Sequence, residues 1–150
     1  MSKVFEDAFA ELQADMISIC LEFSGKTVEE IFVYGTMENR VTSFKVFFRI
    51  RGKMLRMNEL NSVLKSHEKI DDHKDMQLGV LRIGVQDLLK MRELCKEYNM
   101  KMPTEIKIRY DVKKNSMDAQ YRYEPVYSMS MDRSDNDVFD EWMAEMRAGG

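Results

Sequence analysis

Two histidines and four acidic residues are concentrated in residues 67–75, which read His67-Glu68-Lys69-Ile70-Asp71-Asp72-His73-Lys74-Asp75. Imidazole and carboxylate groups are ligands for zinc and iron, so this segment is the best candidate for a metal site. Its spacing matches no metal-binding motif, however, and its two lysines would repel a cation. We therefore expect a solvated surface loop, and a small metal-dependent enzyme that uses residues 67–75 is the alternative.

Nucleophilic chemistry has no stronger candidate. Cys20 and Cys95 both lie within apolar helical patterns, where a thiol is usually inert packing. The 7 glycines are scattered and form no phosphate-binding loop, and the 26 acidic residues single out no carboxylate pair for hydrolysis. We therefore expect a protein that is not an enzyme, with no catalytic residues, no metal site and no cofactor.

An acidic stretch that also carries aromatic residues lies near the C-terminus. Between residues 122 and 145 there are seven acids and two arginines. One interpretation is a surface that steers and docks a basic partner protein. The other is a solvated helix face whose first acids complement the helix dipole, with Phe139 and Trp142 in the core. On the first interpretation, the candidate partner-binding residues are Tyr121, Tyr123, Glu124, Tyr127, Asp132, Asp140 and Glu141.

Charge and composition exclude several classes of protein. The formal net charge is −3 and the pI is about 5.5, whereas a nucleic-acid-binding protein needs a basic surface to neutralise phosphates. Hydrophobic residues make up 44% of the 150 residues, which suits a single folded domain over residues 1–150. Free thiols, acids near the N-terminus and the lack of an apolar run of about 18 residues favour a cytoplasmic protein without a membrane segment.

Apolar residues recur with helical spacing in three segments and alternate with polar residues in five others. The helical segments are residues 4–23, 79–98 and 135–146, the last with Ser134 as N-cap. The alternating segments are residues 31–37, 41–50, 54–57, 106–112 and 117–123. Short connections predict that the first three strands form a meander and the last two a hairpin.

The order of these elements, α-β-β-β-α-β-β-α, predicts an α+β fold. Strands joined by hairpins favour a single antiparallel sheet of about five strands, because a parallel sheet needs strands and helices in strict alternation. We expect three main helices, with helices covering one face of the sheet and part of the other face left open.

Three parts of the chain resemble the YezG-like family of bacterial immunity proteins. The first is the amphipathic N-terminal helix, followed by IFVYGTME at residues 31–38 and FKVFF at residues 44–48. The second is PTEIKIRYD at residues 103–111 with YRYE at residues 121–124, and the third is FDEWM at residues 139–143. The polar segment 66–75 and the methionine-rich segment after Pro125 depart from the family pattern.

The resemblance implies an antitoxin that neutralises one cognate toxin by tight one-to-one binding, without contacting nucleic acid or membrane itself. Toxins of this kind are often nucleases with basic clefts, and an acidic surface that bears aromatic side chains suits such a target. A housekeeping subunit that forms a homodimer through its open sheet face is a further alternative, so the oligomeric state stays open.

Overall fold

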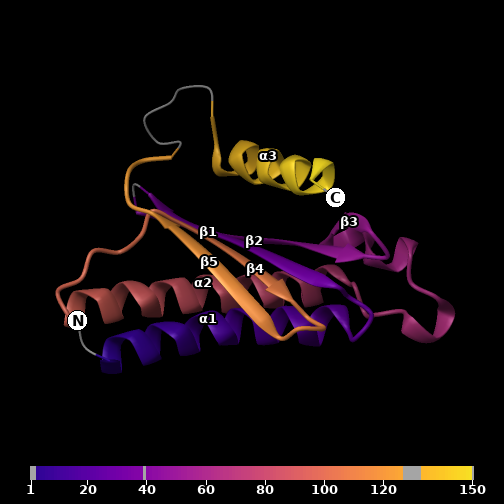
Figure 1. Cartoon of the computed structure of the whole chain (residues 1–150), viewed down its shortest axis with the longest axis horizontal. Helices are drawn as coiled ribbons and strands as arrows, with labels where there is room; N and C mark the ends of the chain where they lie inside the picture. Colours follow the sequence, from indigo (N-terminus) through magenta and orange to yellow (C-terminus); the bar gives the residue numbers. More distant parts are fainter. Residues whose placement is uncertain (1–2, 39, 127–132, 150) are drawn as a thin grey trace.

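The structure is a computed structural model that describes residues 3–38, 40–126 and 133–149 (Figure 1). It shows the predicted α+β fold, with elements in the predicted order. The helices are α1 (Lys3–Ser24), α2 (Lys74–Glu97) and α3 (Asp135–Ala148), and two short 3-10 helices, η1 (Met57–Ser62) and η2 (Ser66–Glu68), precede α2. The strands are β1 (Glu30–Glu38), β2 (Val41–Ile50), β3 (Lys53–Arg56), β4 (Glu105–Asp111) and β5 (Ser116–Arg122).

The five strands form one antiparallel sheet in the order β3-β2-β1-β4-β5, as the sequence predicts. Strand β1 is central, and its Val33 pairs with Val46 of β2 on one side and Ile108 of β4 on the other. The hairpins β2–β3 and β4–β5 therefore extend the sheet in opposite directions, and β5 is an edge strand.

The helices lie on both faces of the sheet (Figure 1). Helices α1 and α2 pack together on one face, and α3 lies on the other. The expectation of helices on one face only is therefore wrong for α3. The physical reason is in β1, where Ile31 and Val33 face α1 and α2 while Phe32 and Tyr34 face α3, all fully buried. A strand that is apolar on both sides needs cover on both sides.

A close contact between α2 and β2 fixes the packing of the first face. A side chain at Gly84 would place its Cβ 2.2 Å from the ring of Phe44. Only glycine therefore allows α2 to approach the sheet this closely at that point.

Aromatic side chains form the core beneath α3. Phe32 and Phe47 stack with their ring centroids 4.4 Å apart, and Trp142 meets Phe47 edge-on at 5.1 Å. Phe139 and Trp142 are 5% and 7% exposed, so they belong to the core rather than to a docking surface. Phe47, on the same face of the sheet, is also fully buried.

Charged side chains beside this core form a paired cluster. The Glu30 carboxylate accepts a hydrogen bond from Arg49 Nε at 2.8 Å and from Arg109 Nε at 2.6 Å. Burial acts to raise the pKa of Glu30, but the hydrogen bonds and charges of Arg109 and Arg49 outweigh it and hold that pKa below its ordinary value.

Helix α2 begins at Lys74, five residues before the predicted start at residue 79. The backbone carbonyl of His73 accepts hydrogen bonds from the amides of Met76 and Gln77, which closes the first turn. Because Met76 and Leu78 are about half exposed, this turn lies off the apolar stripe and its sequence resembles a loop. None of the helices that the structure describes is long and apolar enough to cross a membrane.

Candidate functional site

A cavity of about 280 Å³ opens between the N-terminal half of α1, the segment after α2 and the end of β5. We call it the aromatic pocket. Its apolar lining comes from Phe5, Phe9, Ala10, Cys95, Met100, Pro103, Tyr121 and Tyr123, and its polar lining from Glu6, Gln13 and Lys101. Tyr121 and Tyr123 were predicted as partner-binding residues from the sequence, and the structure brings them together here.

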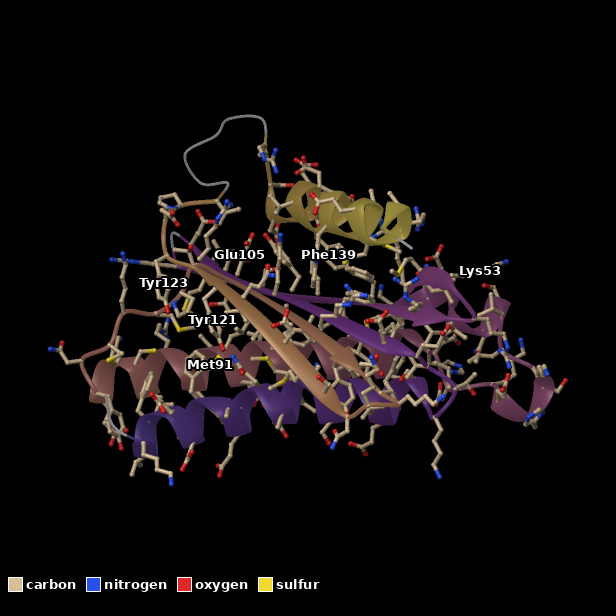
Figure 2. All side chains as sticks on the ribbon, in the orientation of Figure 1. Lys53, Met91, Glu105, Tyr121, Tyr123 and Phe139 are labelled. Atoms are coloured by element: carbon tan, nitrogen blue, oxygen red, sulfur yellow. The ribbon has the colours of Figure 1, made fainter. Side chains whose placement is uncertain are left out.

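The alternation of β5 positions Tyr121, and Tyr123 follows directly after the strand. Residues 117, 119, 121 and 123 face the side of the sheet that α1 and α2 cover, but β5 is the edge strand and extends past that cover. Tyr121 and Tyr123 are therefore 42% and 43% exposed. Figure 2 shows them on the opposite side of the sheet from Phe139 of α3.

Hydrogen bonding and ring packing hold the pocket wall in place. Gln13, a buried polar residue of α1, donates from Nε2 to the Tyr121 hydroxyl at 2.5 Å. The Phe9 ring meets Tyr121 edge-on at a centroid distance of 5.9 Å. On the other side of the pocket, the Lys101 ammonium lies 6.0 Å from the centre of the Tyr123 ring. Tyr121 is thus fixed in one orientation while much of its surface stays open.

Two titratable groups of the pocket, Tyr123 and Cys95, have raised pKa values. Burial raises the pKa of the Tyr123 hydroxyl, with smaller contributions from Tyr121 and Cys95. Burial likewise raises the pKa of the Cys95 thiol, which keeps it protonated and a poor nucleophile. The pocket is therefore suited to binding an apolar or aromatic group rather than to nucleophilic chemistry.

The acidic residues of α3 lie across the sheet from this pocket, because α3 packs on the opposite face. Ser134 caps the helix by accepting from the Asp137 amide, as predicted. Three of the acids form ion pairs within the chain: Asp135 with Lys45 at 3.5 Å, Asp140 with Arg56 at 2.8 Å, and Glu141 with Arg133. Two of these cations come from β2 and β3, so counting charges along the sequence overstated the local negative charge.

The predicted partner-binding residues are therefore divided between two faces. Tyr121 and Tyr123 lie on the α1 side, whereas Asp140 and Glu141 lie on α3 with about half of each side chain exposed. Glu124 is exposed and follows β5, where its carbonyl accepts from Thr104 Oγ1 at 2.6 Å. The remaining two, Tyr127 and Asp132, are outside the residues that the structure describes.

The candidate metal segment, residues 67–75, covers the end of η2, the connection to α2 and its first two residues. Asp71 Oδ1 contacts His73 Nδ1 at 2.7 Å, which holds the pKa of Asp71 below its ordinary value and that of His73 above it. Glu68 accepts a hydrogen bond from the Lys65 backbone amide and others from neighbouring side chains, which lower its pKa to about 2. In the described parts of the chain, no three His, Cys, Asp or Glu side chains are placed to hold a metal ion.

Sequence reasoning missed an acidic groove of about 660 Å³ between α1 and α2. Its charged lining consists of Glu11, Asp15, Asp87, Lys90, Glu93 and Glu97. Asp87 is only 2% exposed and occupies a position on the buried stripe of α2, between Gly84 and Met91. A charged residue on an apolar stripe is the signal that could have identified the groove.

The chain matches no family model, and no curated protein matches it. The function proposed below therefore rests on the pocket and the groove.

Proposed function

We propose that the chain is an immunity protein, an antitoxin that neutralises a cognate toxin by stoichiometric binding. The observation that supports this most is the aromatic pocket, in which two half-exposed tyrosines stand on a wall already fixed by Gln13 and Phe9. Tyrosines at the rim of an apolar hollow are typical anchors of protein–protein interfaces.

The preformed wall favours tight binding. Ordering a side chain on association costs roughly 0.5–1.5 kcal/mol, and a side chain that is already held avoids this cost. The Tyr121 hydroxyl is already bonded to Gln13, and its ring is packed against Phe9. Most residues that line the pocket lie on α1, α2 and β5, so the free surface should change little on binding.

The charge around α1 favours a basic partner. Helix α1 carries five acids and one lysine, and its Glu6 lines the pocket while Glu11 and Asp15 line the neighbouring groove. Such a surface speeds association with a protein of opposite charge. A toxin with a basic active-site cleft, such as a nuclease, is the partner with this chemistry.

The alternative functions have less support. In the candidate metal segment, Glu68 and Asp71 already accept hydrogen bonds from within the chain. The open sheet face that a homodimer would use is largely covered by α3. The antitoxin role is therefore the function that best accounts for the aromatic pocket and the acidic surface of α1.

The test is binding of the neighbouring gene's toxin product by calorimetry. Replacing Tyr121 and Tyr123 together by alanine should weaken binding by roughly tenfold or more, because central aromatic anchors carry much of the binding energy. Met117→Ala is the matched control, since Met117 lies on the same strand and side at 39% exposure but outside the pocket. Equal loss in the two variants, or a wild-type protein that neither binds nor inhibits the toxin, contradicts the proposal.

A further inference from the structure

The acidic groove between α1 and α2 has an unpaired carboxylate at its floor. Asp87 is 2% exposed, and among the described residues no donor group forms a hydrogen bond to its Oδ2. Nearly all buried polar groups in folded proteins have such a partner, so an exception calls for an explanation. The unpaired oxygen belongs to a side chain that lines an accessible groove.

A second carboxyl lies close to it. Asp15 of α1 is exposed at the rim and within hydrogen-bonding reach of Asp87. Two ionised carboxylates can only accept hydrogen bonds, so neither satisfies the other unless a proton is shared between them. Burial and the proximity of Asp15 together raise the pKa of Asp87 to about 7.

The lysine that lines the groove, Lys90, does not offset the negative charge of the two carboxyl groups. Lys90 lines the groove and acts to lower the pKa of Asp87, but this effect is smaller than those of burial and Asp15. Glu11 and Glu97 add further negative charge around the pair, whereas Glu93 forms ion pairs at 3.7 Å with Arg92 and Lys96. The group that would complete this site is one more cation carrying hydrogen-bond donors.

We propose that this groove is the docking site for an arginine side chain of the partner protein, held by Asp15 and Asp87. The inference rests on the proposed function, in which the partner is a basic toxin. A guanidinium presents five N–H donors in a planar fork, and this matches a pair of carboxylates better than a single ammonium does.

The position of the groove agrees with this assignment. The aromatic pocket and the groove lie on the two sides of α1: Phe9 and Gln13 line the pocket, whereas Leu12 and Asp15 line the groove. One partner that straddles α1 would reach both, with an apolar or aromatic group in the pocket and an arginine in the groove.

The first test uses an arginine hexapeptide as the probe and follows the Asp87 carboxyl carbon by NMR while the pH is varied. Peptide in the groove should lower the measured pKa of Asp87 by roughly half a unit or more relative to sodium chloride at equal ionic strength. If peptide and salt give the same titration curve, the assignment is overturned.

A matched pair of variants separates local docking from general attraction. Asp15→Asn removes one charge inside the groove, and Glu22→Gln removes one charge from an exposed position of the same helix outside it. Asp15→Asn should weaken peptide binding by roughly fivefold, as expected for a charge-assisted hydrogen bond, and Glu22→Gln by less than about twofold. Equal losses would mean that only the overall field attracts the peptide, which overturns the groove site.

Measuring toxin binding separates the arginine site from the proposed antitoxin role. If the toxin binds wild type and Asp15→Asn equally well, the antitoxin role stands and the groove is not part of its interface. If the peptide results hold but the wild-type protein does not bind the toxin, the groove stands as an arginine site and the antitoxin role fails.

Discussion

Replacing Asp87 by asparagine should make the isolated protein more stable. Asparagine keeps the shape of the side chain but removes the charge that faces Asp15 at the floor of the groove. A group that serves only the structure would show the reverse, because losing its interactions would weaken the fold. Stabilisation on removal is typical of residues that serve binding at a cost to stability.

The magnitude follows from the pKa of Asp87, which rises from 3.8 to about 7 on folding. The folded state therefore retains a proton that the unfolded state loses, so the stability contributed by Asp87 is full below about pH 4 and is lost as the pH rises towards 7. A shift of about three units corresponds to about 4 kcal/mol as an upper limit. The groove is open to water, which screens the interaction, and we expect about 2 kcal/mol.

The assay is urea unfolding followed by circular dichroism at about pH 5 and about pH 8, for wild type, Asp87→Asn and the control Glu22→Gln. The free energy of unfolding of Asp87→Asn should exceed that of wild type by about 2 kcal/mol at the higher pH and by clearly less at the lower pH. A variant that is less stable than wild type at both pH values, or a difference that does not depend on pH, would refute the reasoning about this carboxylate pair.

Three further predictions concern the core and α3. Gly84→Ala should lower the free energy of unfolding by about 2 kcal/mol because its Cβ would meet the Phe44 ring. Gly79→Ala, whose Cβ would meet no described atom beyond its own helix backbone within 4 Å, should raise the free energy of unfolding by about 0.5–1 kcal/mol. Equal thermal stabilities of the two variants would contradict the packing of α2. Glu30→Gln should cost about 2–3 kcal/mol at neutral pH by leaving Arg49 and Arg109 unpaired. Because the folded pKa of Glu30 is lowered, that loss should shrink as the pH falls through it, and a pH-independent loss in urea unfolding would argue against the ion pairs. Replacing Asp140 and Glu141 by lysine should leave the circular dichroism spectrum unchanged but slow toxin association at low salt. The effect should be smaller above about 0.15 M salt, where the screening length is about 8 Å. Equal association rates of wild type and variant in stopped-flow measurements would exclude these residues from steering the toxin.

Local patterns were sufficient to predict most of the fold. Strand β2 has its predicted bounds, Val41–Ile50, because Phe44, Val46, Phe48 and Ile50 alternate without interruption and all enter the core. Helix α3 begins after Ser134 as expected, because the cap is a local interaction between neighbours in the sequence.

The remaining features depend on contacts between distant residues. The side of the sheet on which α3 packs is decided by Phe32, Tyr34 and Phe47, whose burial on the second face becomes apparent only once the strands are paired. The groove likewise needs Asp15 and Asp87 to meet through the packing of α1 on α2, and neither residue has a local pattern that links it to the other. For the same reason, the sequence alone leaves both interpretations of the aromatic residues around α3 open, since exposure is a property of the assembled layers.

The most direct test of the antitoxin role is a toxicity assay in which the neighbouring gene's product is expressed with wild type, with Tyr121→Ala/Tyr123→Ala or with Met117→Ala. Wild type and Met117→Ala should restore growth and form a one-to-one complex by mass measurement, whereas the tyrosine variant should protect poorly and bind roughly tenfold or more weakly. A toxin that remains active in the presence of folded wild-type protein, with no complex formed, would contradict the account.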